Sequence, residues 1–129
     1  MKPVEESPPH AWSDKLRWAA RGIARAVRGE RNFRVHLTIA LVVVIAAAAL
    51  AISPSQWCLL ALCIATVLAA EMFNTAIEHL ARAITPEHNA SIRDALDMSA
   101  GGVLVAALGA ALVGAVVFVQ RLGAPVEWW

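Results

Sequence analysis

Four residues near the middle of the sequence have the types and spacing needed for proton transfer and metal binding. Glu71, Asn74, Thr75 and Glu78 recur at helical spacing, so they share one face of a helix that continues an apolar run. That run begins at Trp57, and the residues from there to Glu71, at about 1.5 Å each, span roughly 21 Å of a hydrocarbon core about 30 Å thick. A carboxylate at this depth costs on the order of a few kcal/mol unless it is paired. Glu71 is therefore a candidate functional residue, with a purely structural role as the alternative.

The position of Glu71 suits it to accept a proton from a lipid alcohol held at headgroup depth, which makes it the candidate general base. Glu78 falls near the interface, and Glu30 falls where a basic helix leads into the first apolar run. Two carboxylates at one level can bind Mg²⁺ through oxygen and leave other positions for water and phosphate. For Glu30 the alternative is a surface ion pair with Arg31 or Arg34.

A charged cluster precedes the third apolar run and contains Glu87, His88, Arg93, Asp94 and Asp97. By itself the cluster also fits an ordinary solvated rim. The sequence contains no G-x-x-x-x-G-K-[ST] loop, no H-R-D or D-F-G kinase set and no H-E-x-x-H motif. Any nucleotide site in this chain must therefore be unconventional.

The composition predicts that these residues are held by membrane-spanning helices. The chain of 129 residues is 59% hydrophobic and only 16% charged, outside the usual balance of soluble domains. Apolar runs long enough to span a bilayer occupy about 35–52, 57–84 and 91–119. Residues 14–34 predict an amphipathic helix lying in the interface, and residues 1–13 a disordered tail. The predicted fold class is all-α and integral membrane, with three transmembrane helices.

The distribution of basic residues predicts the topology. Eight of the eleven Lys and Arg residues lie in the first 34 positions, whereas the turn at 53–56 has none. The positive-inside rule then places the N-terminus in the cytoplasm and, after three spans, the C-terminus outside. The expected partner of the basic segment is an anionic membrane surface and not nucleic acid, because no nucleic-acid-binding motif accompanies it.

The third span carries a surface of small residues. Ala106, Ala110 and Gly114 repeat every four residues, and Gly101, Gly102 and Gly109 lie nearby. Such a surface permits close approach of helices. It therefore predicts an oligomer, which would also help to enclose the acidic residues of a small three-helix unit.

The segment 70–78, AEMFNTAIE, resembles the signature of the prokaryotic diacylglycerol kinase family, which includes the undecaprenol kinases. The likeness runs from about Leu16 to Val119. Further segments similar to family motifs are 22–23, 30–36, 85–88 and 97–101. The resemblance implies an ATP- and Mg²⁺-dependent lipid kinase of the bacterial cytoplasmic (inner) membrane, formed by residues 14–129 and assembled as a homotrimeric bundle with shared active sites. The expected acceptor is diacylglycerol, giving phosphatidic acid, and the alternative acceptor is undecaprenol.

The resemblance also implies roles for individual residues. Glu71 would be the catalytic base, Asn74 a residue that positions the reacting groups, and Glu30 and Glu78 the Mg²⁺ ligands. Contacts to ATP and its metal are expected from Trp18, Glu30, Glu78, Glu87, His88, Asn89, Arg93 and Asp97. Contacts to the lipid are expected from Arg21, Arg34 and Glu71.

Two positions depart from the family pattern. Arg82 stands where the family usually carries Asp, and Leu96 stands where it usually carries Lys. Arg93, one helical turn earlier, is the candidate replacement for the missing cation, although an Arg is a fork and not a point charge. These departures favour a non-catalytic assembly subunit as one alternative function. A proton or cation pathway through Glu71 and Glu78 is another, but no acid lies in the outer half of the second span.

Overall fold

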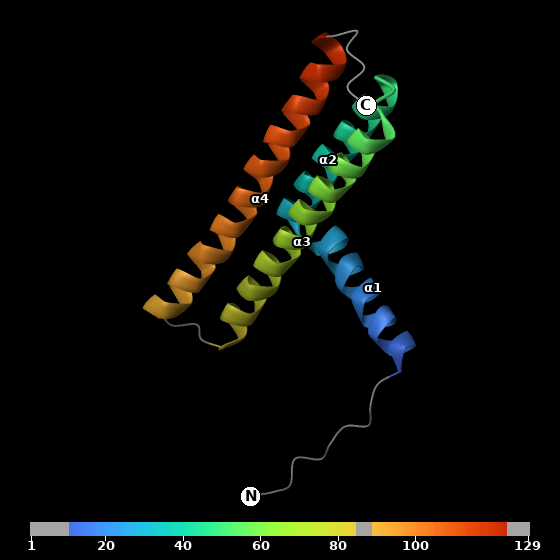
Figure 1. Ribbon diagram of the computed structural model, residues 1–129. Coiled ribbons are helices and arrows are strands. Elements are labelled where there is room, and N and C mark those ends of the chain that lie inside the picture. The colour runs from blue at the N-terminus through green and yellow to red at the C-terminus, as the bar shows by residue number, and fades with distance from the viewer. Residues whose placement is uncertain (1–10, 85–88, 124–129) are drawn as a thin grey trace, which may run out of the picture.

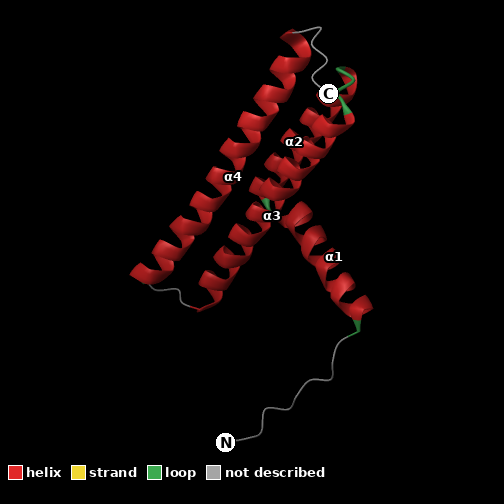
Figure 2. Ribbon diagram, in the orientation of Figure 1, coloured by secondary structure: helices red, strands yellow, loops and turns green. Residues whose placement is uncertain are grey.

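The computed structural model describes residues 11–84 and 89–123. Nearly all of this part of the chain is helical (Figures 1 and 2). The helices are α1 (Trp12–Gly29), α2 (Arg31–Ala49), α3 (Pro54–Ile84) and α4 (Ala90–Gly123). Within the described ranges there is no strand, so the all-helical prediction is confirmed there.

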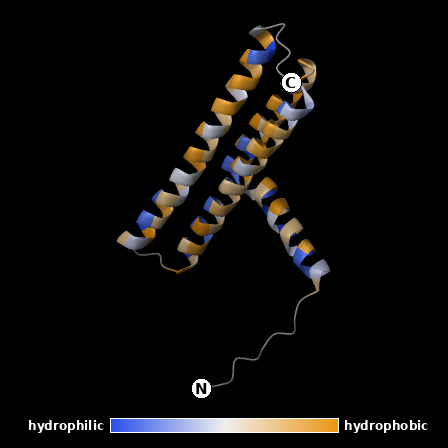
Figure 3. Cartoon of the chain, in the orientation of Figure 1, coloured by the Kyte–Doolittle hydropathy of each residue, from blue (hydrophilic) through white to orange (hydrophobic). Residues whose placement is uncertain are grey.

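Three of these helices, α2, α3 and α4, are long and apolar enough to cross a membrane, as the sequence predicted. They contain 19, 31 and 34 residues, which correspond to about 28, 46 and 51 Å of helix. Because a hydrocarbon core is about 30 Å thick, α3 and α4 have several turns to spare. Figure 3 shows α4 hydrophobic along most of its length and hydrophilic near both ends. Counted from Pro54, Glu78 lies in the spare turns of α3 and Glu71 lies before them.

The three long helices pack side by side, and α1 leaves the bundle at an angle (Figure 1). The main packing is between α3 and α4, and α2 packs against α3. Four of the six buried apolar side chains of the described residues form one cluster close to the turn between α2 and α3: Ala47, Ile52, Leu60 and Val117. At the same end Arg121 Nε donates to the Leu50 carbonyl oxygen at 2.6 Å. This bond satisfies a carbonyl that the end of α2 leaves without a helical partner.

The break between α1 and α2 differs from the expected boundary at residue 34. α1 ends at Gly29, a weak helix former, and Glu30 has an extended backbone with φ −105° and ψ 116°. Across the break Arg34 Nη1 donates to the Arg28 carbonyl oxygen at 2.8 Å. The break takes Glu30 out of helical register and leaves its side chain between two helices.

The start of α3 also differs from expectation, because the helix begins at Pro54 and not at 57. Ser53 and Gln56 form a reciprocal cap: the Ser53 N–H donates to Gln56 Oε1 at 3.0 Å, and the Gln56 N–H donates to Ser53 Oγ at 3.3 Å. Pro54 occupies the first helical position, where its missing N–H costs nothing. The proline thus starts this helix as well as separating it from α2.

Candidate active site

Glu71 on α3 is a buried carboxylate with one oxygen unused. Its residue exposure is 3%, and with Asn74 it makes up the buried polar residues of the described chain. Oε2 lies 3.9 Å from His36 Nε2 on α2. Oε1 is buried and has no hydrogen-bond partner among the described residues. Burying an unpaired oxygen is costly, so this atom is well suited to receive a ligand.

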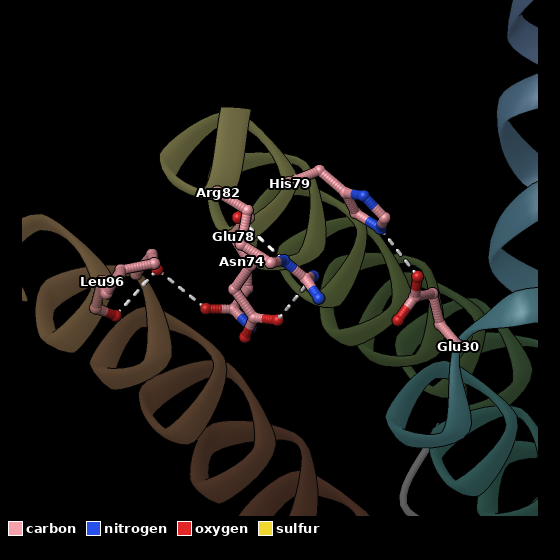
Figure 4. A network of polar contacts seen from close by, with 7 residues as sticks. Glu30, Asn74, Glu78, His79, Arg82 and Leu96 are labelled. Atoms are coloured by element: carbon pink, nitrogen blue, oxygen red, sulfur yellow. Dashed lines mark hydrogen bonds and ion pairs between the residues drawn. The ribbon is translucent and has the colours of Figure 1, made fainter. Parts of the chain in front are cut away.

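Asn74 makes two side-chain hydrogen bonds, one with α4 and one within α3. Ser99 Oγ on α4 donates to Asn74 Oδ1 at 2.7 Å, and Asn74 Nδ2 donates to Glu78 Oε1 at 2.9 Å. Figure 4 shows Asn74 and Glu78 on the side of α3 that faces α4. Because an ionised carboxylate only accepts hydrogen bonds, Glu78 fixes the orientation of the amide, and the Ser99 hydroxyl donates to the amide oxygen. The amide in turn holds the Glu78 carboxylate.

The Glu30 side chain is held by a histidine of α3. Its Oε1 lies 2.8 Å from His79 Nε2 (Figure 4). In the described chain Glu30 therefore pairs with a histidine across the bundle and not with Arg31 or Arg34, the alternative that its sequence neighbours suggested. This contact ties the α1–α2 break to the helix that carries Glu71.

Glu30, Glu71 and Glu78, here called the acidic group, are the candidate carboxylates for a cation shared with phosphate. The charges of Glu78 and Glu30 both repel that of Glu71. Among the described residues no three His, Cys, Asp or Glu side chains gather closely enough to hold a metal by themselves. Mg²⁺ commonly uses one or two carboxylates, with water and substrate phosphates as its other ligands. The donor set of Glu30 and Glu78 fits that pattern.

Comparison with known proteins assigns the family. The model of the family described as prokaryotic diacylglycerol kinase matches residues 17–118. The chain belongs to this family. It is 36% identical over 104 residues to a Bacillus subtilis undecaprenol kinase, covering 81% of this chain and 85% of that protein. It is 33% identical over 100 residues to a Synechocystis diacylglycerol kinase, covering 77% of this chain and 57% of that protein.

For this family member, the predicted ATP contacts around the α3–α4 connection are described only in part. Glu87 and His88 lie outside the described residues. Asn89 caps α4, since its Oδ1 accepts the N–H groups of Ser91 and Ile92 at 3.0 and 3.2 Å. The structure thus gives Asn89 a role in starting the helix that its predicted contact with ATP did not include.

The other predicted contacts of the kinase lie on exposed parts of α1, α2 and α4. They are Trp18, Arg21, Arg34, Arg93 and Asp97. The Arg34 guanidinium donates to the Arg28 carbonyl oxygen across the helix break. The contacts of these residues with ATP or lipid stay predictions.

Three residues that pair with the acidic group or with Asn74 were not assigned roles from the sequence: His36, His79 and Ser99. His36 had a signal, because it is one of two polar residues at the start of an apolar run. His79 and Ser99 had none of comparable strength. Spacing along one helix identifies residues on one face of that helix, whereas these two act across helix pairs.

Replacing Ser99 by alanine is expected to raise the Mg²⁺ concentration for half-maximal rate by about fivefold. The change removes the hydrogen bond from Ser99 Oγ to Asn74 Oδ1, whose net contribution is about 1 kcal/mol, and frees Asn74 to turn away from Glu78. A Mg²⁺ titration of the initial rate measures the effect. Ser91→Ala is the matched control, because Ser91 uses its backbone N–H in the α4 cap. Equal titrations for Ser99→Ala and wild type would exclude this positioning role.

Proposed function

We propose that the chain transfers the γ-phosphoryl group of ATP to the primary hydroxyl of a membrane lipid. The observation that carries the proposal is Glu71 Oε1, a buried carboxylate oxygen without a hydrogen-bond partner among the described residues. Family membership supplies the reaction class, and the carboxylates of Glu30 and Glu78 lie close enough to act on Glu71. These observations support a proton acceptor and metal-binding carboxylates in one site.

In the proposed reaction the lipid hydroxyl oxygen bonds to the γ-phosphorus while the bond from that phosphorus to the β–γ bridging oxygen breaks. The hydroxyl proton passes to Glu71, and ADP leaves. Glu30 and Glu78 would hold Mg²⁺, which when bound neutralises charge on the triphosphate. Asn74 keeps the Glu78 carboxylate in place. Catalysis then depends on positioning and electrostatics.

Diacylglycerol is the first acceptor that we propose, and phosphatidic acid is its product. Undecaprenol is the second, and the fuller coverage of the Bacillus relative, 85% against 57% for the Synechocystis relative, supports it. The test is transfer of label from γ-radiolabelled ATP by detergent-purified protein, with the two lipids side by side. Label in neither lipid, with Mg²⁺ and ATP saturating, would contradict the proposal and favour the non-catalytic alternative.

We further propose that the protein lies in the bacterial inner membrane with its N-terminus in the cytoplasm and its C-terminus outside. Three helices able to span support a multi-pass protein, and the basic N-terminal region supports the orientation. α1 would lie in the interface, since it carries both exposed apolar side chains, such as Trp12 and Leu16, and five basic residues of the sequence.

The proposed assembly is a homotrimer in which the small residues of α4 contribute to association. Gly114→Leu is expected to shift the purified protein toward smaller species, because a larger side chain forces neighbouring helices apart. Within one subunit a Cβ added at Gly114 meets no atom within 4 Å. Because Gly114 also lines the cavity between α2, α3 and α4, lipid binding is measured beside association, which separates an effect of the leucine inside the subunit from an effect on assembly.

Crosslinking in native lipid followed by gel analysis measures the assembly. The control is Val119→Leu, which introduces the same side chain at an exposed position of the same helix. A wild-type protein that crosslinks only as a monomer would exclude active sites shared between subunits.

A cation at position 96 is expected to improve ATP binding. Figure 4 places Leu96 on α4 beside the Asn74–Glu78 pair, so Leu96→Lys should lower the apparent KM for ATP by about tenfold and change the lipid KM less. If Arg93 already supplies the charge, Arg93→Ala should raise the ATP KM and Leu96→Lys should change little. Steady-state rates at varied ATP separate the two cases. Unchanged ATP dependence in both variants would exclude phosphate contacts at this part of α4.

A further inference from the structure

His36 on α2 lies opposite Glu71 on α3. Its Nε2 lies 3.9 Å from Glu71 Oε2, too far for a direct hydrogen bond. The histidine side chain is 22% exposed and the glutamate side chain 4%. Glu71 Oε1 has no hydrogen-bond partner among the described residues, and a buried polar atom ordinarily needs one.

An apolar cavity of about 540 Å³ begins at His36. It lies between α2, α3 and α4, and its walls include Val43, Val67, Ala107 and Phe118. Among the lining residues His36 alone carries a side-chain nitrogen. From Ala107 to Phe118 the α4 wall is about 16 Å long, roughly half of a hydrocarbon core. The cavity is thus apolar with a polar group at one end, and that polar group lies 3.9 Å from Oε2 of Glu71.

We propose that His36 binds the acceptor hydroxyl together with Glu71, while the hydrocarbon chain of the acceptor occupies the cavity. This inference rests on the proposed function and deepens it, because it assigns a second residue that touches the reacting oxygen. The ligand is a primary alcohol at the headgroup end of an apolar chain. Diacylglycerol and undecaprenol both have that chemistry.

The distance between the two groups fits one bridging oxygen. An oxygen about 2.8 Å from each of two polar atoms can bridge a gap of 3.9 Å. The hydroxyl would donate its proton to Glu71 and accept a hydrogen bond from His36 in the tautomer that carries its proton on Nε2. One lone pair of the hydroxyl oxygen then stays available to attack phosphorus. His36 therefore directs the proton to the base without removing the nucleophile.

The test measures binding without ATP, so that it does not depend on turnover. The probes are a diacylglycerol, undecaprenol and the analogue of each that lacks the hydroxyl, bound to full-length protein in nanodiscs. Wild type is expected to bind each alcohol that it accepts about tenfold more tightly than its deoxy analogue. His36→Ala should lose most of that preference. The pair of lipids identifies which acceptor the cavity takes.

Two variants serve as controls. His36→Gln keeps an N–H donor at similar reach and should retain much of the preference. Thr38→Val changes the other polar residue of the span, whose hydroxyl donates to the Arg34 carbonyl oxygen at 2.8 Å, and should leave the preference unchanged. If His36→Ala does not fold, the ring-nitrogen chemical shifts of His36 in the wild type give the same answer. They should move with the alcohol and not with the deoxy lipid.

An alcohol preference that persists in full in His36→Ala would overturn the inference, as would a wild type that binds alcohol and deoxy lipid equally. Loss of the preference in Thr38→Val as well would attribute it to the helix and not to the histidine, and would also overturn it. Failure of the proposed function is separate. In that case the wild type would transfer no phosphate to either lipid, whatever the binding preference.

Discussion

Replacing Glu71 by glutamine is expected to lower turnover by about 10²–10⁴-fold, the contribution typical of a positioned general base. The substitution keeps the shape of the side chain and removes only its capacity to accept the hydroxyl proton. Because Glu71 lies within the span and contacts His36 and not the predicted ATP residues, the KM for ATP should change little. Rates at saturating lipid and varied ATP measure both quantities.

Two measurements separate loss of the general base from unfolding and from a general change in polarity. Thermal unfolding of Glu71→Gln in detergent should match or exceed that of wild type, because the variant no longer buries a carboxylate. Thr66→Val, at an exposed position of the same helix, is the matched control for a change in polarity. Full turnover in Glu71→Gln would remove Glu71 from the mechanism and leave its burial as a structural feature.

The sequence was sufficient to predict the membrane-spanning helices and the residues on the acidic face of α3. Apolar runs of spanning length define α2, α3 and α4 because their physics is local: every backbone polar group in lipid must be satisfied within the helix. The spacing of Glu71, Asn74 and Glu78 follows from helical periodicity in the same way. The structure has Glu71 and Asn74 buried and Asn74 bonded to Glu78, as residues on one face should be.

The contacts between helices could not be predicted from helical periodicity. The pairing of His79 with Glu30 depends on where α1 ends, and a glycine followed by one extended residue sets that point more sharply than the apolar pattern does. Ser99 meets Asn74 only because α4 returns antiparallel to α3 in one register. Pro54 was predicted to break a helix, but the reciprocal cap between Ser53 and Gln56 makes it the first residue of α3. Each of these outcomes depends on side chains that are distant in sequence or on cap geometry.

Loss of a Mg²⁺ ligand at Glu78 is expected to have the second large effect on activity. Glu78→Gln is expected to raise the Mg²⁺ concentration for half-maximal rate by about tenfold or more and to lower the maximal rate, because a hard cation loses a charged oxygen ligand. Glutamine can still accept the hydrogen bond from Asn74 Nδ2 through its amide oxygen, so the link to Ser99 is kept. The variant therefore separates loss of charge from loss of the hydrogen-bond network.

Glu30→Gln should act in the same direction, since glutamine preserves an acceptor for His79 while removing the charge. Arg82→Ala supplies the opposite change. The Arg82 Nη2 atom lies 3.7 Å from Glu78 Oε2, so its positive charge competes with a cation at that carboxylate. Removing the arginine should lower the Mg²⁺ concentration for half-maximal rate, though only slightly, because both side chains are substantially exposed and water weakens the pair.

A half-maximal Mg²⁺ concentration that rises in both glutamine variants and falls in Arg82→Ala would support a metal at these carboxylates. If all three superimposed on wild type, the acidic group would have to act on the lipid or the nucleotide without a bound Mg²⁺.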